Sequence, residues 1–308
     1  MRQITGGVMQ TIEELKKHFA LPGCIDFIKT EGGLIAARVE NRAAKAAITL
    51  QGAQLIDYRL NDEPVIWLSE EASLKPGKSI RGGAPVCWPW FGAHADDSAL
   101  PAHGYARTVP WRLLRVDAGN PACTELEFAL IDSAKTRSMF PQPLKLRLTL
   151  RIGASLELAL QTTNSGSKPV RLTEALHTYF AVGDVGKVSL HGLEGCNYLD
   201  KVTGFDRKQQ HGAVRIDGEV DRIYLDTDGR CEIRDPVLGR RLVLRAKNSR
   251  STVVWNPGSD KARQMGDLGP EGYRRMLCVE TANAAENALE LQPGQVHTLE
   301  VGIAQRAY

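Results

Sequence analysis

The sequence predicts an all-β fold of packed, mainly antiparallel sheets. The dominant hydrophobic period along the chain is two, which is typical of strands with one buried face. Its 29 glycines and 15 prolines are spread throughout, as expected where turns join many short strands. Few windows have a helical period, so alternating β–α–β units are not expected.

The composition indicates a folded, soluble chain. The 308 residues include 39 Lys or Arg and 36 Asp or Glu, so the net charge is +3, too small to indicate nucleic acid or an anionic membrane as a partner. Hydrophobic residues make up 43% and charged residues 24%, which is close to the globular average. No stretch approaches the ~18 apolar residues of a membrane-spanning helix. We expect a cytoplasmic monomer.

The cysteines are scattered and give no metal motif. There are six of them and no CxxC pair, so neither a zinc knuckle nor a dithiol motif is available. We expect reduced, mostly buried thiols and no bound metal.

One short helix is expected near the N-terminus. Residues 1–10 have no periodicity and are treated as a leader. Thr11 and Glu14 fit a capping box, and Ile12, Leu15 and Phe19 form one apolar stripe.

The remaining chain predicts strands and a single domain. In residues 144–152 five apolar side chains alternate with charged or polar ones, and the alternation resumes at 156–160, so we expect a hairpin. Further strands are expected at residues 46–50, 124–130, 171–180, 241–245, 252–255, 276–280 and 296–303. No linker interrupts the chain, so we predict a leader and helix over 1–32 and one sandwich domain over 33–308.

Two loop segments combine arginine with residues that prevent a regular strand. Residues 80–92 hold three glycines and two prolines, with Trp88, Trp90 and Phe91 offering a rigid aromatic wall. Arg81 at its entry could hold an anion through its planar guanidinium, or lie solvated in a surface loop. Residues 103–107 add donors for hydroxyls or phosphate, namely His103 and Arg107.

Two strand segments and one further aspartate are also candidates. On a strand over 172–180, His177 and Tyr179 share one face, although a lone histidine is more often structural. Glu280 ends an apolar run, where an unpaired carboxylate is costly to desolvate. Asp221 could accept hydrogen bonds from a ligand or pair with the adjacent Arg222.

Six of these segments occur in an order that resembles a known family. RGGAPVCWPWFG, HGYAR, LHTYF, DRIY, VVWNP and CVE, spread over residues 46–304, are similar to the hexose-6-phosphate mutarotases of the aldose 1-epimerase superfamily. Each motif alone is modest, whereas six in register are specific. The N-terminal helix and residues 93–101 lie outside the resemblance.

The resemblance implies a galactose-mutarotase-like β-supersandwich and a hexose 6-phosphate substrate, with no metal and no cofactor. It implies that His177 and Glu280 are catalytic, and that Arg81, His103, Arg107 and Asp221 bind the sugar phosphate. Lys261, after the VVWNP motif, is a further candidate for phosphate. Reference pKa values suggest an ionised Glu280 as base and a chargeable His177 as acid.

Three other functions remain open from the sequence. A non-catalytic carbohydrate-binding or sugar-sensing protein would keep the aromatic residues and arginines without an opposed acid and base. A glycoside hydrolase would need paired carboxylates, for which Glu174 could partner Glu280, although Glu174 has the opposite strand parity to His177. A mutarotase of free aldoses is the third.

Overall fold

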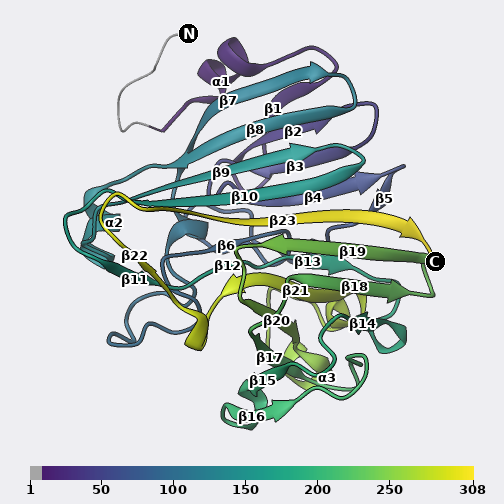
Figure 1. Cartoon of the computed structure of the whole chain (residues 1–308). Helices are drawn as coiled ribbons and strands as arrows, with labels where there is room; N and C mark the ends of the chain where they lie inside the picture. Colours follow the sequence, from purple (N-terminus) through teal and green to yellow (C-terminus); the bar gives the residue numbers. More distant parts are fainter. Residues whose placement is uncertain (1–8) are drawn as a thin grey trace.

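Antiparallel strands build most of the molecule (Figure 1). The computed structural model describes residues 9–308. Throughout this part of the chain, the strands of each sheet pair antiparallel. The predicted all-β class is confirmed.

Helices are short and few. They are α1 (Ile12–Phe19), α2 (Ala134–Met139) and α3 (Gly258–Ala262). Single turns of 3₁₀-helix occur at η1 (Ala106–Thr108), η2 (Val185–Lys187), η3 (Lys201–Thr203), η4 (Gly272–Arg275) and η5 (Ala285–Asn287).

Three sheets and a small ribbon make up the strand layers. The N-terminal sheet holds, in spatial order, β1 (Ile25–Lys29), β2 (Ile35–Glu40), β3 (Lys45–Thr49), β4 (Leu55–Leu60) and β5 (Glu63–Pro64). The outer sheet holds β14 (Ser189–His191), β18 (Arg230–Asp235), β19 (Arg240–Lys247), β23 (Val296–Ala307), β10 (Ser155–Asn164), β9 (Leu144–Ile152), β8 (Cys123–Leu130) and β7 (Trp111–Asn120).

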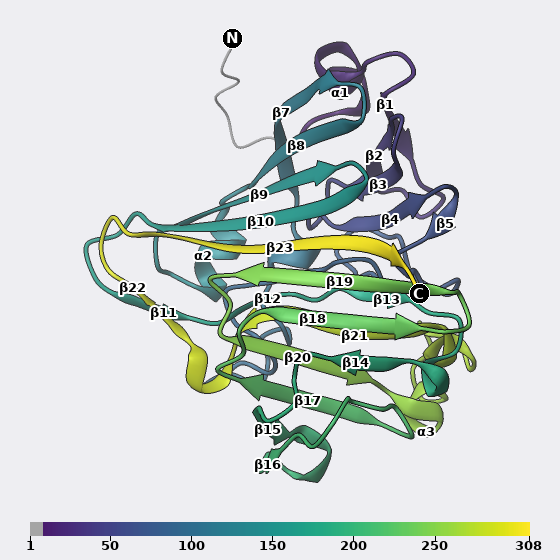
Figure 2. The same cartoon turned by 45° about the vertical axis from the view of Figure 1, so that its right-hand side comes forward.

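The third sheet, here called the site sheet, carries the chemistry described below. It holds β16 (Asp206–Gln209), β15 (Asn197–Asp200), β17 (Val220–Leu225), β20 (Ser251–Asn256), β21 (Met276–Asn283), β12 (Glu174–Leu176) and β6 (Val86–Cys87), and β13 (Tyr179–Ala181) also pairs with β21. The ribbon is β11 (Val170–Leu172) with β22 (Leu289–Leu291). Figure 2 shows β12, β13 and β21 of the site sheet behind β18 and β19 of the outer sheet, with β17, β15 and β16 below them.

Alternation places one large core between the sheets. Leu146, Leu148 and Leu150 of β9 are buried in it while the polar residues between them are exposed or half-buried, as predicted. From the site sheet, Leu277 and Val279 enter the same core. Glu280 therefore points to the opposite face of the site sheet, which is free to line a cavity.

The predicted strand over 171–180 is broken into β11, β12 and β13. β11 leaves to pair with β22. Between β12 and β13, the Thr178 N–H donates to the Leu176 carbonyl at 3.0 Å in a tight turn, and His177 N–H donates to the Pro85 carbonyl at 2.9 Å. The sequence does not reveal this turn, because no glycine or proline marks it within residues 171–180. The other predicted strands are confirmed.

The N-terminal helix is confirmed with its capping box. The Glu14 N–H donates to Thr11 Oγ1, and the Thr11 N–H donates to the Glu14 carboxylate. Leu15 enters the core. The predicted leader falls mostly on residues 1–8, which lie outside the described residues, but Gln10 is buried and exchanges two hydrogen bonds with the Leu113 main chain. The division at residue 32 stays a prediction.

The cysteines are unpaired. All six are free, and Cys87, Cys231 and Cys278 are buried while the other three are half-buried. Within residues 9–308, no helix has the length and apolar character needed to cross a membrane.

Gly104 brings two chain segments together beside the cavity. Its φ of +70° is in the left-handed region, and an added Cβ would overlap the Trp88 carbonyl oxygen. We expect Gly104→Ala to lower the free energy of unfolding by about 2–4 kcal/mol, because backbone strain and overlap add. Gly195→Ala is the control, since Gly195 has φ +80° with open space around its Cβ position. Denaturant titration should show a clearly larger loss at Gly104, and equal losses would contradict the proposed overlap.

Candidate active site

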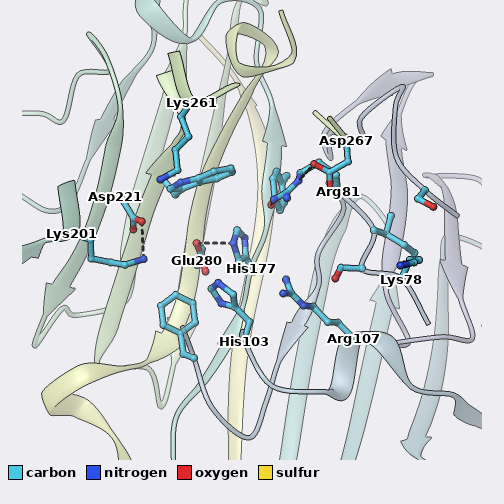
Figure 3. Close-up of a pocket in the computed structure, with 16 residues that line it drawn as sticks. Lys78, Arg81, His103, Arg107, His177, Lys201, Asp221, Lys261, Asp267 and Glu280 are labelled. Atoms are coloured by element: carbon cyan, nitrogen blue, oxygen red, sulfur yellow. Dashed lines mark hydrogen bonds and ion pairs between the residues drawn. The ribbon is translucent and has the colours of Figure 1, made fainter. Parts of the chain in front are cut away.

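The face of the site sheet that looks away from the core carries a cavity of about 470 Å³ (Figure 3). All six site residues predicted from the sequence line it, together with Lys261. The full lining is Ser73, Lys78, Ser79, Ile80, Arg81, Phe91, His103, Arg107, His177, Tyr179, Lys201, Asp221, Trp255, Lys261, Asp267 and Glu280.

Two ionisable side chains meet on the floor of this cavity. His177 Nε2 lies 3.4 Å from Glu280 Oε1, and the two residues are only 7% and 1% exposed. Each also keeps a buried polar atom without a hydrogen-bond partner among the described residues, His177 Nδ1 and Glu280 Oε2. A contact of 3.4 Å is longer than the usual hydrogen bond of about 2.7–3.2 Å, so both groups retain capacity for another partner.

Sheet register explains this meeting. Leu176 on β12 is paired with Thr281, and Tyr179 on β13 with Cys278, so His177 comes opposite Glu280. The turn between β12 and β13 lets one strand, β21, pair with both of them. An imidazole and a carboxylate about 100 residues apart in the chain are thus held side by side by main-chain hydrogen bonds.

Aromatic rings support the imidazole. The His177 and Tyr179 rings stack at 4.9 Å with an interplanar angle of 9°, which fits the prediction that both project from one face. Trp255 from β20 meets His177 edge-on at 6.1 Å. The predicted aromatic wall is corrected: Phe91 lines the cavity, whereas Trp88 and Trp90 belong to the core, because the loop turns their rings inward.

His103 forms a second side of the floor. Its ring lies 5.7 Å from the His177 ring and 4.8 Å from the Phe91 ring. Its Nδ1 accepts the Gly92 N–H at 3.4 Å. Burial, with Arg107 and other nearby cations, lowers the pKa of His103 to about 3, so this imidazole is neutral at physiological pH.

Burial also governs the histidine of the floor pair. It lowers the pKa of His177 well below its usual value, and His103, Arg107 and Arg81 act in the same direction. The expectation from reference values of a readily charged His177 is therefore altered by its surroundings.

The carboxyl of the pair shifts in the opposite direction. Burial raises the pKa of Glu280 well above its usual value, and the Asp221 carboxylate raises it further. Lys201 and Arg107 lower it again but do not cancel the effect of burial. Both members of the pair are thus driven toward their neutral forms.

Charged side chains surround the floor. Lys201 Nζ lies 2.7 Å from Asp221 Oδ2, and Lys261 Nζ lies 2.5 Å from Glu219 Oε1. Asp221 is therefore paired with Lys201, not with the adjacent Arg222. Figure 3 places Lys201 and Asp221 on one side of the floor pair and Arg81, Arg107 and Lys78 on the other.

The two predicted arginines differ in their surroundings. Arg81 Nε donates to Asp267 Oδ1 at 3.1 Å, and its Nη1 donates to the Tyr179 hydroxyl at 3.1 Å. Arg107 donates from Nη2 to the Ala102 carbonyl at 2.9 Å, while its Nε is buried without a partner in the described chain. Arg107 thus keeps more unused capacity for an anion.

Sequence reasoning missed Lys78, Lys201 and Asp267 as lining residues. Lys201 follows a strand end and Lys78 lies in a polar turn, and charged residues at such positions usually face solvent. Their partners in space come from distant segments, which a single sequence does not reveal.

Comparison with known proteins identifies relatives over most of the chain. Residues 36–304 match the family model described as aldose 1-epimerase. A protein of Escherichia coli (strain K12), provisionally named glucose-6-phosphate 1-epimerase, is 36% identical over 95% of this chain and 100% of its own length.

Solved structures agree. A protein of Salmonella typhimurium provisionally described as a mutarotase, YeaD, is 31% identical, with a TM-score of 0.88 over 94% of this chain and 96% of its own. The galactose 1-epimerase of Lactobacillus acidophilus NCFM shares the fold, with a TM-score of 0.72, 15% identity and coverage of 92% and 98% of the two chains.

The fold is therefore that of the galactose-mutarotase-like proteins, as the sequence resemblance implied. The chain belongs to the aldose 1-epimerase family.

The charges of Lys201 and Asp221 should move the titration of Glu280 in opposite directions. Lys201→Met removes a cation that lowers the pKa of Glu280, so the acidic limb of any pH profile that depends on ionised Glu280 should move to higher pH, by about one unit. Asp221→Asn removes an anion and should move it to lower pH. Lys261→Met is the control, with no shift expected. The profile to measure is kcat/KM against pH, and shifts of the same sign would contradict this electrostatic account.

Proposed function

We propose that the protein interconverts the α and β anomers of hexose 6-phosphates, chiefly glucose 6-phosphate. The observation that carries this proposal is the buried contact of His177 and Glu280 on the cavity floor, with Arg81, Arg107 and Lys78 on one side of it. The names of the relatives in Escherichia coli and Salmonella typhimurium support the same activity.

The reaction requires an acid and a base at one carbon. A base removes the proton of the C1 hydroxyl while an acid protonates the ring oxygen O5, so that the C1–O5 bond opens to an aldehyde. Rotation about C1–C2 and closure on the other face give the other anomer. Glu280 acts as base and His177 as acid in opening, and they exchange roles in closure. No electron or group is transferred, so the reaction needs no cofactor.

The proton count of the pair stays constant. Before opening, protonated His177 faces ionised Glu280. Afterwards the imidazole is neutral and the carboxyl carries the proton. Burial favours the second arrangement, since it drives both groups toward neutrality. Closure reverses both transfers and restores the starting arrangement, so one turnover takes up no net proton.

The remaining lining residues orient the sugar. Arg81 and Arg107 lie on the same side of the floor pair and would hold the remote phosphate (Figure 3). Asp221 on the other side would accept hydrogen bonds from ring hydroxyls. His103, held neutral by burial, would add a hydrogen bond from a fixed imidazole.

The rival functions fit less well. A hydrolase based on Glu174 and Glu280 is disfavoured because Glu174 lies beneath the sheet, 3.0 Å from His297 of β23. A binding module would not need a buried acid–base pair with unused polar atoms. A mutarotase of free aldoses would leave the arginines beside the floor without a ligand.

We propose that this enzyme is a monomer and acts in the cytoplasm. Six free cysteines suit a reducing compartment.

Replacement of either floor residue should abolish most of the catalysis. We expect His177→Asn and Glu280→Gln each to slow catalysed anomer exchange by about 10²- to 10⁴-fold, because each removes one positioned proton-transfer group. The measurement is NMR exchange between α- and β-glucose 6-phosphate. His297→Asn is the matched control, since it alters a histidine–glutamate pair on the opposite face. Full activity of either floor variant would refute the mechanism.

Arg81 should affect phosphorylated substrates most. We expect Arg81→Ala to raise the KM for glucose 6-phosphate by about tenfold or more, and that for glucose much less, because a charge-assisted bond to phosphate is lost. Asp267→Asn serves as a comparison, since it frees Arg81 Nε without removing its charge. Equal effects of Arg81→Ala on both sugars would exclude the phosphate role.

A further inference from the structure

The cations that line the cavity differ in whether a carboxylate already neutralises them. Lys201, Lys261 and Arg81 are each paired, with Asp221, Glu219 and Asp267 respectively. Lys78 and Arg107 have no carboxylate within ion-pair distance in residues 9–308. These two side chains are therefore the unneutralised positive charges of the cavity.

The turn that carries Lys78 is fixed by a buried glutamine. Gln51 Nε2 donates to the Lys78 carbonyl at 2.8 Å, and Gln51 Oε1 accepts the Gly77 N–H at 2.7 Å. Gln51 is only 8% exposed, and its side-chain amide makes these hydrogen bonds to the main chain of the turn. The Lys78 side chain is exposed and lines the cavity, and the hydrogen bonds of Gln51 fix the main chain that carries it.

Asp267 partly neutralises Arg81, so Arg81 is less available to an anion than Arg107 is. Arg81 uses Nε on Asp267 and Nη1 on the Tyr179 hydroxyl, which leaves Nη2 free. A phosphate bound directly by Arg81 would be repelled by the neighbouring Asp267 carboxylate. Arg107, by contrast, has a buried Nε with no partner in the described chain, and this donor needs an acceptor.

We propose that Lys78, on its Gln51-anchored turn, is a phosphate-binding residue that acts together with Arg107 and determines the preference for phosphorylated over free hexoses. This inference rests on the proposed function. It places the phosphate monoester dianion between Lys78 and Arg107, with Arg81 contributing at the edge. Two cations without carboxylate partners match the roughly two negative charges of a sugar phosphate at neutral pH.

The test compares Lys78→Met with Lys75→Met. Lys75 lies in the same exposed segment but does not line the cavity, so it controls for net charge. For Lys78→Met we expect a KM for glucose 6-phosphate raised about tenfold, with kcat for this sugar and both constants for glucose little changed. Lys78→Arg should restore most of the affinity, and Lys75→Met should behave as the unchanged protein.

The outcomes separate this inference from the proposed function. An equal rise in KM for glucose and glucose 6-phosphate, or equal effects of the Lys75 and Lys78 variants, would overturn the role of Lys78. If the unchanged protein accelerates anomer exchange of neither sugar, the proposed function fails. Calorimetric measurement of glucose 6-phosphate binding then tests the phosphate-binding role of Lys78 by itself. Binding weakened by Lys78→Met and not by Lys75→Met would still support a phosphate site, and binding equally strong in both variants would refute it.

Discussion

The burial of an imidazole and a carboxylate against each other is the constraint on which the site depends. The charged form of each residue is costly in that position, because burial lowers the pKa of His177 and raises the pKa of Glu280. Burying such a pair is costly for folding, so its presence in a cavity points to a functional role. The main-chain pairing of β21 with β12 and β13 holds His177 and Glu280 together. It fixes the position of each residue independently of the contact between their side chains.

The site sheet divides structural and chemical work between its two faces. Leu277 and Val279 stabilise the core on one face, and Glu280 projects from the other. Around the floor pair, charges are separated by side, with the Lys201–Asp221 pair on one flank and Arg107 on the other (Figure 3). A sugar phosphate has the same asymmetry, with hydroxyls at one end and a dianion at the other.

The sequence predicted the strands well, because alternation such as that in residues 144–152 reports directly on one buried face. It placed the residues of the site through a resemblance and not through periodicity. It wrongly placed Trp88 and Trp90 at the site, because side chains in an irregular loop do not alternate between two faces as they do on a strand. It also missed ion partners such as Asp267, distant in the chain from Arg81, and the effect of burial on the titration of Glu280.

A crystal structure with glucose 6-phosphate bound tests the central claim most directly. The account predicts O1 and O5 of the sugar within hydrogen-bonding distance of Glu280 and His177, which both line the cavity. A sugar whose anomeric carbon lay away from both residues, or whose phosphate covered them, would contradict it.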